Sequence, residues 1–314
     1  MSSKKQPVIE FLDAVISSLT KQQQRLLSLK FGQEMSNSQI AKVAPALGLD
    51  EVQSETKVSE LIGGMLEIIQ IYERELDSAK RVQQKLLPDS LPKIDDVEVA
   101  VRYQPFLGVS GDYYDFIAMD ERRLGVALGD VSGKGISAAL LMASARASLR
   151  AHARAHDSTA ETLGQLNQIL LKDSMPEHFL TLIYGILDTK SRTFSYSNAG
   201  HNPPLLYNRH SKSYQMLETG GTMVGILDEA EYEEESLNLS EGDVLVIYTD
   251  GIVEACNDAE EPFEVQRLCD IVQENAHQPA EKLIDQIYEL VLDFCGELQD
   301  DATVLVLKVQ RGRL

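Results

Sequence analysis

The pattern of hydrophobic and polar positions changes near residue 89. Before it, apolar residues recur every three or four positions, as in Phe11, Val15 and Leu19 and again in Leu26 and Leu29. This is the spacing of the buried face of an α-helix. After residue 89, short apolar runs of strand length alternate with helical stretches. The pattern therefore predicts an all-α N-terminal region followed by a mixed region of strands and helices.

The mixed region is predicted from its longest apolar segments. Runs typical of strands lie at 97–103, 124–128, 180–187, 193–197, 244–248 and 303–307. Helical periodicity covers 136–154, 159–172, 265–275 and 280–294. Strands separated by pairs of helices indicate layers of the α+β class.

A longer helical pattern connects the two regions. Val58, Leu61, Met65, Ile68 and Tyr72 follow the 3-4-3-4 spacing of a coiled-coil seam. The pattern is also compatible with one amphipathic helix that packs on its own domain. We favour a parallel homodimer seam, because the helix ends just before the candidate catalytic motifs and could transmit a signal to them. Ordering of the seam would then shift the helices at 136–154 and 159–172.

These patterns predict three parts. They are a helical regulatory or interaction module at 1–57, a coiled-coil linker helix at 58–87 and a catalytic domain at 88–314. Residues 26–42 loosely resemble a helix-turn-helix of the sigma-factor region-four kind. Pro45 interrupts that unit, and the would-be recognition helix carries Glu51 and Glu55, which would face DNA phosphates. Nucleic-acid binding is therefore not expected, although a transcriptional regulator stays an alternative function. The sequence does not identify an upstream activator of the module.

Composition agrees with a soluble cytoplasmic protein. Apolar residues make up 43% and charged residues 25% of the chain, and no apolar run has the length of a membrane span. The only cysteines are Cys256, Cys269 and Cys295, which argues against a disulfide framework. A net charge of −20 disfavours partners such as nucleic acid or an anionic membrane.

The candidate chemistry lies in four short acidic turns at the ends of apolar runs. They are Ser110-Gly111-Asp112, Gly129-Asp130-Val131, Thr249-Asp250-Gly251 and Asp300-Asp301-Ala302. Carboxylates beside glycine suit hard divalent cations, and no His or Cys pair has zinc spacing. Each turn alone is ordinary, but together they predict a magnesium or manganese site for hydrolysis of a phosphate ester.

Five stretches in register extend this hypothesis to a family. They are 109–116 (VSGDYYDF), 129–136 (GDVSGKGI), 198–204 (NAGHNPP), 248–255 (YTDGIVEA) and 300–306 (DDATVLV). Together they resemble the SpoIIE/RsbU-type branch of the metal-dependent protein phosphatase (PPM) family. The similarity begins at 82–88 (VQQKLLP), just before the catalytic region.

The resemblance implies two packed antiparallel sheets flanked by helices, and a centre of two Mn²⁺ or Mg²⁺ ions. Asp130 would be the bridging ligand and, with Asp250, a catalytic residue. The Val131 carbonyl, Asp112 and Asp300 would complete the ligand set, and Asp301 is the less favoured alternative to Asp300. The implied substrate is phosphoserine or phosphothreonine on a STAS-type anti-sigma-factor antagonist, in a partner-switching pathway. A catalytically inactive scaffold is the alternative, although all four carboxylates are present.

Several neighbouring residues have predicted supporting roles. Gly111, Gly129 and Gly251 would allow sharp turns and close approach to the metal, and Gly133 and Gly135 would do so for the loop entering the helix at Ile136. The start of that helix favours a nearby phosphate. Lys134 is expected to be solvated.

Two residues of the eukaryotic-type PPM phosphatases have no counterpart here. Those enzymes carry a His after their Asp-Gly metal motif, where this chain has Val131-Ser132, and a phosphate-binding Arg, for which we find no match. His201 is a candidate general acid, but it could equally order the turn before Pro203.

Overall fold

The computed structural model describes residues 20–32, 35–44, 54–106, 108–175 and 178–310. The chain divides into two compact units, Met1–Lys80 and Arg81–Leu314. Helix α4 (Glu55–Leu86) runs through the division, so its last turn belongs to the larger unit. The predicted boundaries at residues 57 and 87 remain predictions.

The smaller unit is a helical cluster. It contains α2 (Lys21–Leu27), the π-helical turn η1 (Ser28–Gly32), α3 (Asn37–Val43) and the first part of α4. Ser36 caps α3 in a reciprocal capping box, in which its hydroxyl accepts from the Gln39 N–H and the Gln39 side chain accepts from the Ser36 N–H. The rest of the region predicted as helical, including Phe11, Val15 and Leu19, lies outside the described residues.

The apolar stripe of α4 is divided between two environments. Val58 and Met65 are buried in a core shared with Leu26, Leu29 and Ile40 of the same chain, and Leu61 packs against that core. Ile68 and Tyr72, by contrast, are 40% and 46% exposed. The first half of the predicted dimer seam is therefore covered within the chain, which is the packing expected of an amphipathic helix on its own domain.

The larger unit contains two sheets. The first has the strand order β1-β11-β10-β6-β7 and the second β2-β3-β4-β5-β8, with β9 paired to β5. All named pairs are antiparallel except the short β5–β8 pair. The first sheet comprises β1 (Val97–Gln104), β6 (Leu205–Asn208), β7 (Ser213–Met216), β10 (Val244–Tyr248) and β11 (Ala302–Val309). The second comprises β2 (Tyr113–Ala118), β3 (Arg123–Val131), β4 (Leu180–Asp188), β5 (Thr193–Ala199), β8 (Gly220–Gly221) and β9 (Glu235–Asn238).

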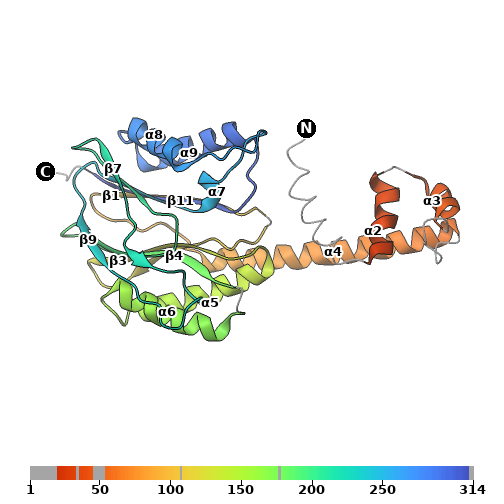
Figure 1. The fold of residues 1–314 in the computed structure, drawn as a ribbon, viewed down its shortest axis with the longest axis horizontal. Coiled ribbons are helices and arrows are strands. Elements are labelled where there is room, and N and C mark those ends of the chain that lie inside the picture. The colour runs from red at the N-terminus through yellow and green to blue at the C-terminus, as the bar shows by residue number, and fades with distance from the viewer. Residues whose placement is uncertain (1–19, 33–34, 45–53, 107, 176–177, 311–314) are drawn as a thin grey trace. The chain divides into compact units, whose positions relative to one another are not determined.

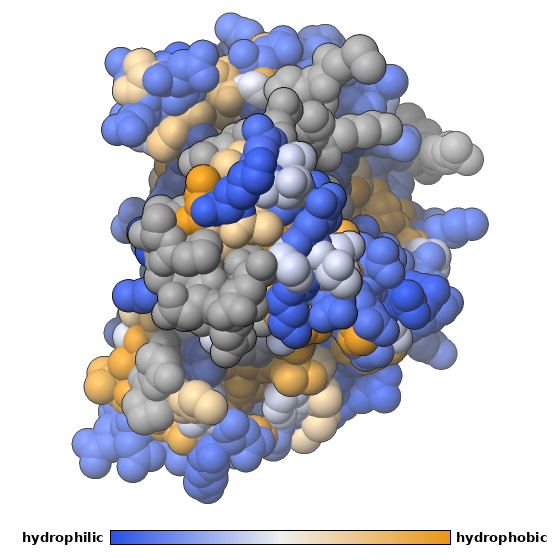
Figure 2. All heavy atoms as spheres, turned by 90° about the vertical axis from the view of Figure 1, so that its right-hand side faces the viewer, coloured by the Kyte–Doolittle hydropathy of each residue, from blue (hydrophilic) through white to orange (hydrophobic). Residues whose placement is uncertain are grey.

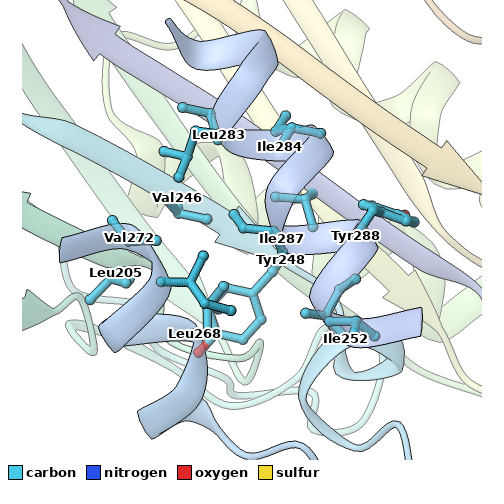
Figure 3. Close-up of a cluster of buried hydrophobic side chains, with 14 of the residues drawn as sticks. Leu205, Val246, Tyr248, Ile252, Leu268, Val272, Leu283, Ile284, Ile287 and Tyr288 are labelled. Carbon is cyan, nitrogen blue, oxygen red and sulfur yellow. The ribbon is translucent and has the colours of Figure 1, made fainter. Parts of the chain in front are cut away.

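Helices cover the outer face of each sheet (Figure 1). The helices α5 (Ile136–Ala153) and α6 (Thr159–Asp173) pack on the second sheet, and α8 (Val265–Asn275) and α9 (Ala280–Cys295) on the first. A third apolar layer, which includes Val126, Ile183 and Leu305, lies between the sheets. In Figure 3, Leu268 and Ile287 point from α8 and α9 toward Val246 and Tyr248 of β10. This confirms the predicted α+β fold of two packed antiparallel sheets flanked by helices.

Strand register brings the acidic turns to the strand ends. Tyr113, at the start of β2, pairs with Gly129 near the end of β3. In the other sheet Tyr248, at the end of β10, pairs with Val304 near the start of β11. A short helix, α7 (Asp250–Val253), follows β10. Each sheet thus contributes two acidic turns from one pair of neighbouring strand ends.

None of the described helices is both long enough and apolar enough to cross a bilayer. The coloured surface of the face in Figure 2 is mostly hydrophilic, with hydrophobic residues in separate patches.

Candidate metal centre

The four acidic turns converge in space. Asp112 and Asp130 interact electrostatically, and Asp130 in turn interacts with Asp250 and Asp300. These carboxylates come from both sheets and are separated by up to 188 residues in the chain (300 − 112). A pocket of about 180 Å³ beside them is lined by Asp250, Asp300 and Glu254, among others. The structure therefore brings the predicted carboxylate ligands near one another, and two of them, Asp250 and Asp300, line one pocket.

Asp112 is held from one side only. It is 1% exposed, and its Oδ2 accepts hydrogen bonds from the Thr249 hydroxyl at 2.9 Å and the Thr303 hydroxyl at 2.5 Å. Its other oxygen, Oδ1, is buried and has no hydrogen-bond partner. A buried carboxylate oxygen without a partner is costly, and a cation is one way to satisfy it.

The carboxylates raise one another's pKa values. Burial raises the pKa of Asp130 to about 8, and the charges of Asp250 and Asp300 add to the rise. Burial, followed by the charges of Asp130 and Asp301, raises the pKa of Asp112 well above its usual range. Like charges held together in a buried site favour either protons or a cation.

Asp300 and Asp301 have different surroundings. Asp301 accepts from the Phe106 N–H at 2.7 Å and the Gly111 N–H at 2.9 Å, so both of its oxygens are engaged in joining two loops. Asp300 lines the pocket, and its Oδ2 lies 2.9 Å from the Nζ of Lys134. Asp300 is therefore the carboxylate of this pair that faces the pocket.

Lys134 is exposed to solvent and also has specific partners. Its ammonium also donates to the Gln299 carbonyl at 3.3 Å and lies 5.3 Å from the centre of the Phe106 ring. The side chain is 48% exposed, so the ion pair with Asp300 is open to water. Lys134 lies beside Asp300, where it would compete with a bound cation for that carboxylate.

The donor set fits a hard divalent cation. It consists of carboxylate oxygens together with the Val131 carbonyl, and Asp112 Oδ1 is already buried without a partner. Across the described part of the chain, no three His, Cys, Asp or Glu side chains are already grouped to hold an ion. Metal binding would therefore require small side-chain movements, including release of Asp300 by Lys134.

The glycines permit close contact between the ligand-bearing loops. A Cβ added at Gly111 would lie 2.7 Å from the Val131 carbonyl oxygen and 2.9 Å from Asp130 Oδ1. A Cβ at Gly251 would lie 2.0 Å from the Asp301 carbonyl oxygen, and one at Gly129 2.5 Å from that of Thr181. Gly133 and Gly135 are different: both have positive φ, and a Cβ there would meet open space.

His201 is buried and is not among the residues that line the pocket. It is 5% exposed, its Nδ1 lies 2.9 Å from the Thr181 hydroxyl, and its backbone N–H donates to Asn198. Burial lowers its pKa to about 4, so it is neutral at physiological pH. These contacts fit the turn-ordering interpretation, and they do not favour the general-acid interpretation.

Sequence reasoning missed three kinds of supporting residue. Thr249 and Thr303 donate to Asp112 and lie next to predicted ligand turns in the sequence, so their position could have suggested a supporting role. Asp301 was considered only as an alternative ligand. Gln83, whose amide contacts Ser110, lies in the 82–88 stretch already noted for its resemblance.

Comparison with known proteins places this chain in a family. The family model described as stage II sporulation protein E (SpoIIE) matches residues 120–310. The chain belongs to the SpoIIE family. The matched span includes Asp130, Asp250 and Asp300, while Asp112 lies just before it.

Two relatives in this family come from Bacillus subtilis. The chain is 29% identical to the phosphoserine phosphatase RsbU over 77% of this chain and 72% of RsbU. It is 28% identical to the phosphoserine phosphatase RsbP over 68% of this chain and 52% of RsbP. A solved structure of the RsbU and RsbW domains of a Mycobacterium tuberculosis protein has a TM-score of 0.62 at 27% identity, covering 71% of this chain and 62% of that chain. The chain is thus a SpoIIE/RsbU-type member of the PPM phosphatases.

Proposed function

We propose that this protein is a metal-dependent phosphatase that hydrolyses phosphoserine or phosphothreonine in a protein substrate. The observation that carries the proposal is the convergence of Asp112, Asp130, Asp250 and Asp300, with Asp112 Oδ1 buried and unpartnered. The names of the relatives RsbU and RsbP support the same reaction.

Two Mn²⁺ or Mg²⁺ ions are the proposed cofactors. Asp130 would bridge them, and Asp112, Asp250, Asp300 and the Val131 carbonyl would complete the protein ligands. Bound ions of this kind polarise the phosphate and lower the pKa of a coordinated water. A solved structure of RsbX contains magnesium, which supports the choice of a hard cation.

The residues around the pocket would bind and orient the phosphate. The N-terminus of α5, which begins after Gly135, has no side-chain cap, and its free N–H groups are suited to an anion. The ammonium of Lys134 lies on the same loop and would turn from Asp300 toward the phosphate. The proton for the leaving serine oxygen would come from solvent, because His201 is buried and neutral.

The proposed substrate is a phosphorylated STAS-type antagonist of an anti-sigma factor, acting in the cytoplasm. This follows the SpoIIE/RsbU resemblance, and the structural neighbour that joins RsbU and RsbW domains supports a partner-switching setting. The N-terminal unit would receive an upstream activator. A homodimer would form through four of the exposed apolar residues of α4, Leu66, Ile68, Ile71 and Tyr72.

The direct test is Mn²⁺-dependent hydrolysis of p-nitrophenyl phosphate by the whole chain. Asp130→Asn should abolish turnover, because it removes the shared ligand. Asp293→Asn, an exposed carboxylate in α9, is the matched control and should retain wild-type activity. Absence of turnover, also toward a phosphoserine protein, would leave the inactive scaffold or an enzyme held off until its activator binds; loss of Mn²⁺ affinity in the wild type would favour the scaffold.

A further inference from the structure

The last turn of α4 is joined to the Asp112 loop through one buried side chain. Gln83 is 6% exposed. Its Nε2 donates to the Ser110 carbonyl at 2.7 Å, and its Oε1 accepts from the Ser110 N–H at 3.0 Å. One amide thus satisfies both backbone groups of a single residue and fixes the distance and the orientation of the loop.

The residue after Ser110 is held by hydrogen bonds from both of its backbone groups. The Gly111 N–H donates to Asp301 at 2.9 Å, and its carbonyl accepts from the Val131 N–H at 3.3 Å. The space where a Cβ would lie at Gly111 is already occupied by the Val131 carbonyl and by Asp130. A movement of Ser110 would therefore be passed on to Asp130 and Val131.

Ser110 also holds the next ligand. Its hydroxyl accepts from the Asp112 N–H at 3.0 Å, two residues along the chain. Asp112 then directs Oδ2 to the two threonines and leaves Oδ1 free. The last turn of α4 is thus connected to the free Oδ1 of Asp112 through the Gln83 side chain and the short turn 110–112.

We propose that Gln83 is a positioning residue for the metal centre, setting through Ser110 the place of Asp112 relative to Asp130 and Val131. This inference rests on the proposed function. Anchoring of the helix alone would not need a polar clamp, because Leu87, one turn further on, is buried and apolar. A displacement or rotation of the last turn of α4 would thus reach a metal ligand directly, without passing through α5 and α6.

The test compares three full-length proteins by calorimetric titration with Mn²⁺. Gln83→Met keeps the length of the side chain and removes both hydrogen bonds. Gln84→Met makes the same change at an exposed position of the same turn. We expect Gln83→Met to weaken Mn²⁺ affinity about tenfold or more, as is typical when a group that orients a metal ligand is lost. Gln84→Met should stay within about twofold of the wild type, since an exposed substitution removes no such contact.

Further measurements separate positioning from stability. Thermal unfolding in EDTA identifies a merely structural role, which would lower the unfolding temperature of Gln83→Met without changing Mn²⁺ affinity. Such a result overturns the proposal. Gln83→Asn keeps the amide but shortens its reach, and it should also lose affinity if Gln83→Met folds poorly. A wild type that binds no Mn²⁺ overturns the proposed function together with this inference, whereas equal affinity in wild type and Gln83→Met overturns this inference alone.

Discussion

Asp112 and Lys134 represent opposite ways of balancing charge in the same site. Asp112 is buried, shares one oxygen between Thr249 and Thr303, and leaves the other without a partner. Asp300 is satisfied by the ammonium of Lys134 at 2.9 Å. A divalent cation would bind the free Oδ1 of Asp112 and displace the Lys134 ammonium from Asp300.

Replacement of Lys134 by Met should therefore tighten Mn²⁺ binding. The pair is half exposed, so the expected gain is small, about two- to fivefold. The KM for p-nitrophenyl phosphate should rise, because the cation beside the phosphate is lost. Calorimetry and steady-state kinetics measure the two effects, with Lys172→Met on the exposed surface of α6 as control. Weaker Mn²⁺ binding in Lys134→Met would contradict competition between the Lys134 ammonium and Mn²⁺ for Asp300.

His201 gives a pH dependence of known sign. Its pKa is lowered from 6.5 to about 4 in the folded chain, so the unfolded chain binds the additional proton between these values. Folding stability from this residue is fully present above pH 6.5 and is lost as the pH falls toward 4. Between pH 7 and 5 the loss should be about 2 kcal/mol. Urea unfolding in EDTA measures the free energy of unfolding at each pH, and His201→Gln should lack this part of its pH dependence. If the free energy of unfolding changes equally with pH in the two proteins, the buried neutral state of His201 is contradicted.

At the scale of elements, β2 and α5 are joined by a buried carboxylate. Asp115 is fully buried, and Arg150 of α5 donates to both of its oxygens at 2.6 Å. The Tyr113 hydroxyl donates to it at 2.7 Å. This pair holds the helix that begins beside the metal site against the strand that begins after Asp112.

Asp115→Ala should lower the free energy of unfolding by about 2–3 kcal/mol. Removal of one partner leaves Arg150 uncompensated, although its partial exposure reduces the cost. Glu60→Ala, in the exposed pair with Lys57, should change it by less than about 0.5 kcal/mol. Chemical denaturation measures both, and equal effects would contradict the assigned role of Asp115.

How far each element could be predicted depends on how local its determinants are. The long apolar runs became β1, β3, β4, β5, β10 and β11 close to the expected bounds. The predictions did not include β6–β9, which are short, or β2, whose residues were noted only as a motif. The spacing of Val58 and Met65 was correct for a buried face but could not tell a partner helix from α2 and α3.

The same limit applies to the site. Four acidic turns marked the proposed ligands, because strand ends and glycine are visible in the sequence. The roles of Gln83, Asp301 and His201 depend on contacts with residues 20 to 195 positions away, which no local pattern reveals.

At the scale of the whole molecule, two units share one helix and one carries the site. Leu66, Ile68, Ile71 and Tyr72 lie in the smaller unit, whose own core includes Val58 and Met65. Dimerisation through this stretch would connect an N-terminal signal with the helix that ends at the Gln83 clamp.

A double substitution, Ile68→Glu with Ile71→Glu, should convert the proposed dimer into a monomer. It places charges in an apolar contact while leaving the core of the smaller unit intact. Light scattering coupled to size exclusion measures the mass, and Gln70→Glu at an exposed position is the control. An unchanged mass in the double variant would contradict dimerisation through α4.

The most direct measurement of the central claim is the stoichiometry of Mn²⁺ binding to the whole chain by calorimetry. The account predicts two ions per wild-type chain and loss of both in Asp130→Asn, because that carboxylate is shared. Asp293→Asn should bind as the wild type does. A wild type that binds no Mn²⁺, or an Asp130→Asn variant that binds two ions with unchanged affinity, would contradict a metal centre built on Asp130.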